Sequence, residues 1–123
     1  MTESSYNQGG SLGRIEVVPD VLMTIAYHAA LEVEGVARMA EIPAGKLRRY
    51  RRRPRHTGVL LDMHNDQITF DLYVVMEPQV NVMDVSRAVQ SAIVEAIDRM
   101  IGMPVATVNI HIEDVTNQFP ERA

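Results

Sequence analysis

Two apolar runs separated by the polar tetrapeptide HNDQ constrain the fold more than any other part of this chain. The runs cover residues 59–63 and 68–76, and their composition and spacing are typical of a β-hairpin. With Asn65 and Asp66 as the two loop residues, every pair of facing apolar side chains falls on one face of the hairpin. The pairs are Val59 with Leu72, Leu61 with Phe70, and Met63 with Ile68. A sheet with one apolar face that must be covered follows from this pattern.

Two segments on either side of the hairpin repeat apolar residues every four positions, as amphipathic helices do. The first begins at Pro19 or Asp20 and ends before Gly35. The second has Asn81 as its N-cap and Asp84 three residues later, which resembles a capping box. The apolar stripe of the first segment is Val21, Ile25, Ala29 and Val33, flanked by Leu22, Ala26 and Ala30. The stripe of the second segment is Val85, Val89, Ile93 and Ile97, widened by Ala88, Ala92 and Ala96.

Alternating apolar residues predict one further strand before the first helix, at residues 14–18, and one after the second helix, from residue 105. The predicted order is therefore strand, helix, strand, strand, helix, strand. We expect an α+β fold of the βαββαβ type, with a four-stranded, mostly antiparallel sheet and two helices packed on one face, in a ferredoxin-like or related split βαβ layout. Residues 14–115 form the predicted domain, between a flexible tail at 1–13 and a frayed tail at 116–123.

An acid-free cationic segment interrupts this pattern. Of the 12 Lys and Arg residues, seven lie between positions 46 and 55, in the stretch KLRRYRRRPR. The rest of the chain has five basic and 16 acidic residues, a net charge of −11. Residues 36–57 have no clear periodicity, which predicts an irregular connector, basic over 44–57, in which a short helix near 44–52 is an alternative. Because solvated loops normally mix charge signs, this segment is our candidate partner-binding site. Its residues are Lys46, Arg48, Arg49, Tyr50, Arg51, Arg52, Arg53 and Arg55.

A second candidate contact is apolar. Leu60, Tyr73 and Val75 should share the face of the hairpin that the helices leave open. Exposed apolar clusters often mark contacts with other chains, and scattered surface residues are the alternative interpretation. The same face is expected to carry Asp62 opposite Thr69 and Asp71 opposite Leu60, a register that argues against a catalytic carboxylate pair.

The residues offer little for catalysis or cofactor binding. The chain has no cysteine, and it contains neither a G-x-S-x-G elbow nor a GK[ST] phosphate loop. Its four histidines, His28, His56, His64 and His111, do not have the spacing of a zinc site. We therefore expect a non-enzymatic protein without a cofactor, a metal or a small-molecule substrate. Since no apolar run approaches the roughly 20 residues of a membrane span and the first 13 residues do not resemble a signal peptide, a cytoplasmic location is the default expectation.

Taken together, the residues also resemble a known family. GRIEVVPDVLMTIAYHAALEVEGVARM, the restart GVLLDM, and the stretch from ITFDLYVVM to MIGMPVATVNIHIEDV are similar to the alkaline shock protein family of bacterial envelope stress response proteins. The resemblance covers roughly residues 13–115. It implies a small cytoplasmic, non-enzymatic protein that in some members is held at the membrane through a partner and is able to self-associate.

These observations lead to one functional hypothesis and one alternative. The hypothesis is an adaptor or self-assembling module near the inner face of the cell envelope, peripheral to the inner membrane through a partner, with the cationic segment contacting a protein or a second copy. An anionic membrane surface is a further candidate partner, and plain solubility is the interpretation without a partner. The alternative is a nucleic-acid-binding regulator that uses the same arginines and stacks Tyr50 on bases.

Overall fold

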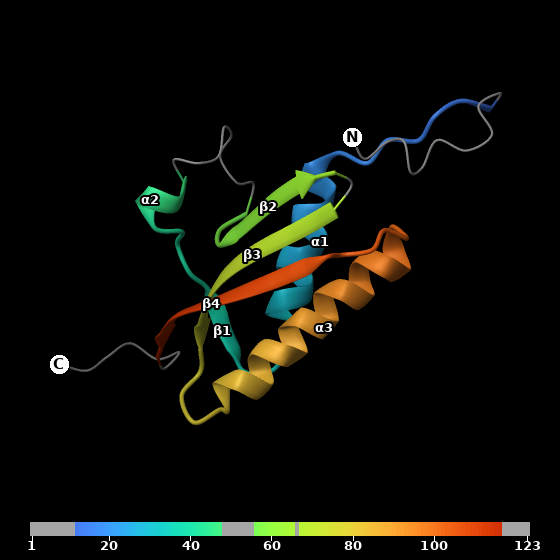
Figure 1. Ribbon diagram of the computed structural model, residues 1–123. Helices are drawn as coiled ribbons and strands as arrows, with labels where there is room; N and C mark the ends of the chain where they lie inside the picture. The colour runs from blue at the N-terminus through green and yellow to red at the C-terminus, as the bar shows by residue number, and fades with distance from the viewer. Residues whose placement is uncertain (1–11, 48–55, 66, 117–123) are drawn as a thin grey trace.

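The computed structural model describes residues 12–47, 56–65 and 67–116. Within them, the chain forms α1 (Pro19–Leu31), β1 (Val36–Met39), α2 (Ala44–Leu47), β2 (Val59–His64), β3 (Gln67–Met76), α3 (Val82–Met100) and β4 (Thr107–Val115). Figure 1 shows one four-stranded sheet accompanied by two long helices. The predicted α+β class is confirmed.

The hairpin of β2 and β3 has the register that the sequence predicts. Val59 lies opposite Leu72, Leu61 opposite Phe70, and Met63 opposite Ile68. Asn65 takes the positive φ of 53° that a tight two-residue hairpin loop requires. The side chains of Ile68, Phe70 and Leu72 are completely buried in the main core, so the predicted apolar face is the face covered by helices.

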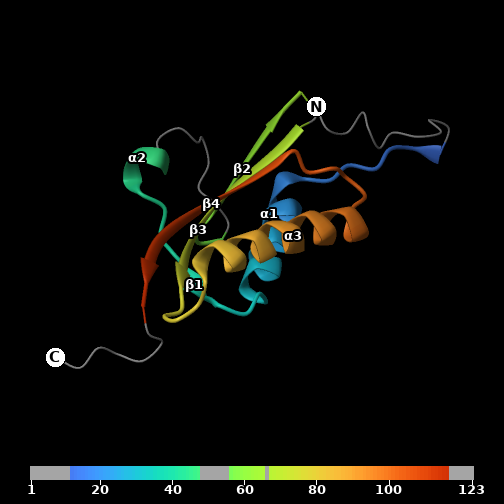
Figure 2. The same ribbon diagram turned by 60° about the horizontal axis from the view of Figure 1, so that its bottom comes forward.

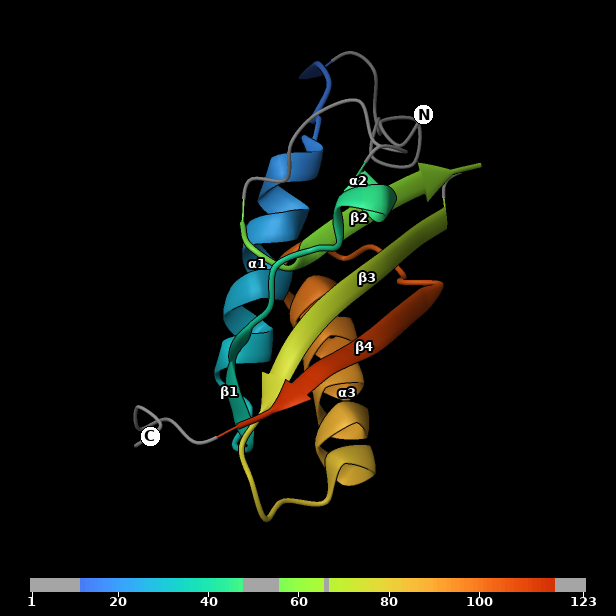
Figure 3. The ribbon, with the colours of Figure 1, turned by 90° about the vertical axis from the view of Figure 1, so that its left-hand side faces the viewer.

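β3 is the centre of the sheet, and all three other strands pair with it. β1 and β2 are antiparallel to β3, whereas β4 is parallel, so the predicted mostly antiparallel sheet is confirmed. β2 pairs with β3 from Gln67 to Leu72, and β1 pairs with its last residues, 74–76. Figure 3 shows β1 and β2 end to end along one edge of β3, with β4 along the other edge.

Tyr73 is the residue of β3 at which β1 and β2 meet. Its carbonyl accepts a hydrogen bond from Ala40 N at 2.7 Å, and its N–H donates to Gly58 O at 2.8 Å. Both main-chain groups of one strand residue point to the same edge, so Ala40 and Gly58 lie on the same side of β3. The chain thus leaves this edge after residue 40 and returns to it at residue 58.

The strand predicted at residues 14–18 does not form, and the predicted βαββαβ order is wrong at this point. The first strand comes after α1, at Val36–Met39, within the stretch that we expected to be irregular. β1 follows Gly35, whose φ of +107° turns the chain back onto the end of β3. With β1 and β2 on one edge of β3 and β4 on the other, β3 has no free edge for residues 14–18.

Both long helices pack on the same face of the sheet, as predicted (Figure 2). α3 buries the predicted stripe of Val85, Val89, Ile93 and Ile97, and Asn81 Oδ1 accepts the predicted capping bond from Asp84 N at 3.0 Å. α1 begins at Pro19, and it buries the flanking residues of the predicted stripe more deeply than the centre of that stripe. Its buried residues are Leu22, Met23, Ala26 and Ala30.

The shift of the buried side of α1 toward the flanking residues of the stripe has a physical cause in its sequence. The helix PDVLMTIAYHAAL carries apolar residues around most of its circumference, so the spacing does not select one face. Val21, from the predicted stripe, is 42% exposed, whereas Leu22 is completely buried. The contact with α3 and the sheet therefore decides which side of α1 is buried.

Candidate partner-binding site

The structure describes the first two residues of the cationic segment, 46 and 47, and the chain on both sides of the segment. Of the predicted contact residues, Lys46 is exposed in α2, near the point where the segment begins. Arg48, Arg49, Tyr50, Arg51, Arg52, Arg53 and Arg55 lie outside the described residues. The flanking residues 40–47 and 56–58 therefore define how the segment is attached to the sheet.

Leu60, Tyr73 and Val75 are not exposed, so the prediction of an exposed apolar contact is wrong. Their exposed fractions are 3%, 2% and 2%, and together with Ala40 they form a second buried cluster, which we call the outer cluster. Ala37 and Ile42 pack against it. The hairpin alternation places these side chains on the predicted face, but the chain that follows β1 covers them.

His56 attaches the returning end of the segment to α1. Its ring stacks on Tyr27, with ring centroids 4.4 Å apart and planes inclined by 20°. Its Nε2 lies 3.0 Å from Thr24 Oγ1, and that hydroxyl donates its proton to Asp20 O at 2.9 Å. Because the single hydroxyl proton is already used, the Nε2–H of His56 donates to Thr24. Nothing in the sequence pattern predicts this contact, since residues 24–28 and 56 are far apart along the chain.

Gly58 completes the attachment. Its φ is +80°, and a Cβ atom at this position would lie 2.8 Å from both Ala40 O and Tyr73 O. Only glycine combines that backbone conformation with so close an approach of two carbonyls. The chain is thus held at residue 40 and at residue 58 against the same residue of β3.

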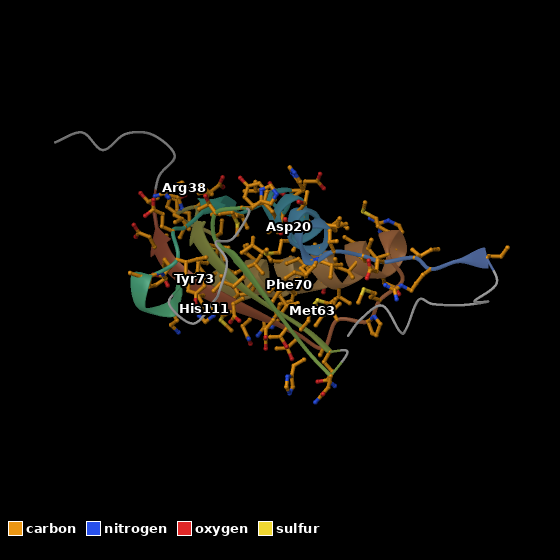
Figure 4. All side chains as sticks on the ribbon, turned by 90° about the horizontal axis from the view of Figure 1, so that it is seen from above. Asp20, Arg38, Met63, Phe70, Tyr73 and His111 are labelled. Atoms are coloured by element: carbon orange, nitrogen blue, oxygen red, sulfur yellow. The ribbon has the colours of Figure 1, made fainter. Side chains whose placement is uncertain are left out.

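A histidine–aspartate pair lies beside the outer cluster. His111 Nε2 is 2.9 Å from Asp71 Oδ1, and the imidazole stacks on Tyr73 at 4.4 Å with an interplanar angle of 10°. Figure 4 shows Tyr73 and His111 next to each other, near α2. The sequence pattern assigned no contact to His111 and did not predict this pair, although it gave the register of Asp71 opposite Leu60 correctly. The contacts join β4 to β3 on the face of the sheet that the long helices leave open.

The described residues form neither a metal-binding group nor a membrane-spanning helix. No group of three or more His, Asp or Glu side chains in the described ranges is arranged to hold a metal ion. In the same part of the chain, no helix combines the length and the apolar character needed to cross a membrane.

Comparison with known proteins identifies relatives over nearly the whole chain. Residues 7–117 match the model of the alkaline shock protein family, which is described as having a cell envelope-related function. The uncharacterized protein YqhY of Bacillus subtilis (strain 168) is 34% identical over 113 residues, which cover 91% of this chain and 82% of YqhY. The uncharacterized protein Spy1535 of Streptococcus pyogenes serotype M6 is 30% identical over 105 residues, which cover 85% of this chain and 80% of Spy1535.

One solved structure has a similar fold. The structure of MamM CTD M250L superposes with a TM-score of 0.53 at 18% sequence identity, and the match covers 77% of this chain and 95% of the other. At this level of identity the likeness concerns the arrangement of helices and strands alone.

Proposed function

We propose that this chain, which belongs to the alkaline shock protein family, is a non-enzymatic adaptor in a cell envelope-related process. In this proposal the cationic segment, residues 46–55, contacts an acidic surface on a protein partner. The partner holds the adaptor at the inner face of the envelope.

The main support for this proposal is the way the segment is attached. Ala40 and Gly58 bond to one residue of β3, and the stacking of His56 on Tyr27 adds a contact on α1. A charged stretch that needed only solubility would not require a buried cluster at one end and a stacked histidine at the other. The attachment keeps the two flanks of the segment in fixed places on the molecule, which reduces the entropy lost when a partner binds.

The composition of the segment supports an anionic partner. It holds seven cations and no acid, while the rest of the chain carries a net charge of −11. Arginine forms planar, bidentate hydrogen bonds with carboxylates, so the six arginines between positions 48 and 55 favour an acidic protein surface. Such complementarity increases the association rate and is weakened by salt.

Replacing Arg51, Arg52 and Arg53 together by Ala tests the proposal. The matched control replaces Arg14, Arg87 and Arg99 by Ala, which removes the same charge at exposed positions outside the segment. We expect the first variant to lose about tenfold or more in affinity for an acidic polypeptide such as polyglutamate at low salt, and the control to lose less than about twofold. Fluorescence anisotropy over a series of salt concentrations measures both.

Two further probes separate the other partners. Vesicles containing phosphatidylglycerol and a short single-stranded RNA are titrated under the same conditions. If RNA binds most tightly and depends on Tyr50 as well as on the arginines, the nucleic-acid alternative is correct. If the two triple variants bind every probe equally, the segment has no binding role.

A further inference from the structure

Residues 14–18 have the sequence alternation of a strand, and Val18 has extended φ and ψ angles of −78° and 150°, but no strand pairs with them in the described structure. Arg14 Nη2 and Glu16 Oε2 form an ion pair at 3.1 Å, which places both side chains on one side of an extended chain. On the other side, Ile15 is 69% exposed, while Val17 packs against the main core. In the part of the chain that the structure describes, the main-chain groups of residues 14–17 have no hydrogen-bond partner.

The open edge of β4 is complementary to this segment. β4 pairs only with β3 among the described strands. The carbonyl of Val108 accepts a hydrogen bond from Gln90 Nε2 at 2.9 Å, and we take it to point away from β3. Main-chain groups of successive residues point to alternate edges of a strand, so the N–H and C=O of Ile110 point to the same open edge as those of Val108. Because a carbonyl oxygen accepts two hydrogen bonds, Val108 remains able to pair with an added strand.

The flank of α3 next to this edge provides room for side chains. A shallow hollow of about 270 Å³ is lined by Gln90, Ser91, Val94 and Glu95. Val94 is 39% exposed there, and Gln90 connects the hollow to β4. A strand added about 4.8 Å beyond β4 would direct every second side chain toward this flank. An apolar residue such as Ile15 would cover Val94, and its neighbours Arg14 and Glu16 would point to the opposite face of the sheet.

We propose that residues 14–18 of one copy add as a strand to the open edge of β4 in a second copy. A segment of this length is enough to pair along residues 108–112. The segment belongs to the start of α1, which packs near β2, whereas β4 lies on the far edge of the sheet (Figures 1 and 3). Donor and acceptor therefore lie on opposite sides of one molecule, which favours pairing between copies.

Each copy in such an assembly donates one strand and accepts another, so the contact is head-to-tail and extends into open chains. The inference goes beyond the proposed function, because it adds contact between copies to an adaptor that binds an acidic partner. It involves a surface that is separate from the cationic segment, so each can be tested without the other.

Two exposed substitutions test the contact in the full-length chain. Ile15→Asp damages the donor, and Val94→Lys damages the acceptor by placing a charged side chain where Ile15 would pack. Leu31→Lys is the matched control, because Leu31 is 37% exposed on α1, outside both surfaces. We expect sedimentation velocity to show concentration-dependent chains for the unmodified protein and for the control. Each damaged variant should associate about tenfold more weakly or worse, with an unchanged circular dichroism spectrum.

Mixing the two damaged variants gives the decisive result. The donor-damaged copy still accepts a strand and the acceptor-damaged copy still donates one, so the mixture should form a heterodimer that does not grow. The proposal is overturned if the mixture stays monomeric, if the unmodified protein is monomeric at several hundred micromolar, or if either variant assembles normally. Loss of assembly only when Arg51, Arg52 and Arg53 are replaced would also overturn it, because the cationic segment would then be the contact.

Discussion

The two faces of the sheet are both buried, but by different kinds of structure. On the inner face, α1 and α3 cover Ile68, Phe70 and Leu72. On the outer face, the irregular chain after β1 contributes Ala40 to the outer cluster and packs Ile42 against it. These inner residues are 0% exposed, and the residues of the outer cluster are 2–6% exposed. An irregular segment can therefore exclude water almost as completely as a helix, although it leaves no periodic signal in the sequence.

Replacing one leucine on each face gives the most direct measure of this comparison. Leu60 on the outer face is 3% exposed, and Leu72 on the inner face is completely buried. We expect Leu60→Ala and Leu72→Ala each to lower the free energy of unfolding by about 2–4 kcal/mol, since both remove buried methyl groups and leave a cavity. Chemical denaturation measures the two values. A loss below about 1 kcal/mol for Leu60→Ala alone would mean that the outer cover is open in solution.

The attachment of the outer cover depends on Gly58, which gives a second test. Gly58→Ala should cost more than about 2 kcal/mol of unfolding free energy, because the new Cβ would clash with two carbonyls and the positive φ would be strained. Gly45→Ala is the matched control: it lies in α2, and a Cβ there meets nothing within 4 Å. The control should be neutral or slightly stabilising. Thermal unfolding of both variants distinguishes a local clash from a general effect of replacing glycine.

The smallest expected effect concerns a buried, unpaired hydroxyl in α3, one of the two helices that cover the inner face. Ser86 lies in α3 with 8% exposure, and its hydroxyl has no hydrogen-bond partner among the described residues. Ser86→Ala should raise the unfolding free energy by about 1 kcal/mol, partly through helix propensity and partly by removing an unpaired buried hydroxyl. Ser91→Ala, at an exposed position of the same helix, measures propensity alone. Equal gains for the two variants in chemical denaturation would show that the Ser86 hydroxyl is hydrated or paired in solution.

The sequence predicted those parts of the fold in which local pattern and tertiary contact agree. The register of β2 with β3 followed from a two-residue loop and alternating side chains, and the buried stripe of α3 followed from four-residue spacing. β1 was missed because four residues are too few to show a period. Residues 14–18 do show the period of a strand, but β3 had no edge left for them.

The candidate site was predictable only in its charge. The acid-free run of basic residues is visible in the sequence, and its position before the hairpin follows from the predicted strands, whereas the strand that precedes it, β1, was missed. The stacking of His56 on Tyr27 and the pairing of His111 with Asp71 could not be inferred. Both join residues that are distant in the chain, and both depend on how the elements pack.

β1 and β2 meet at Tyr73, so residues 41–57 form an insertion between two fixed points on the same edge of β3. Hydrogen bonds to Tyr73 fix the chain at Ala40, where it leaves β3, and at Gly58, where it returns. The residues between them could therefore differ in number or in sequence without changing the pairing of the strands. The length and charge of this stretch could in this way change while the scaffold stays intact. The same junction offers a defined position for grafting foreign peptides.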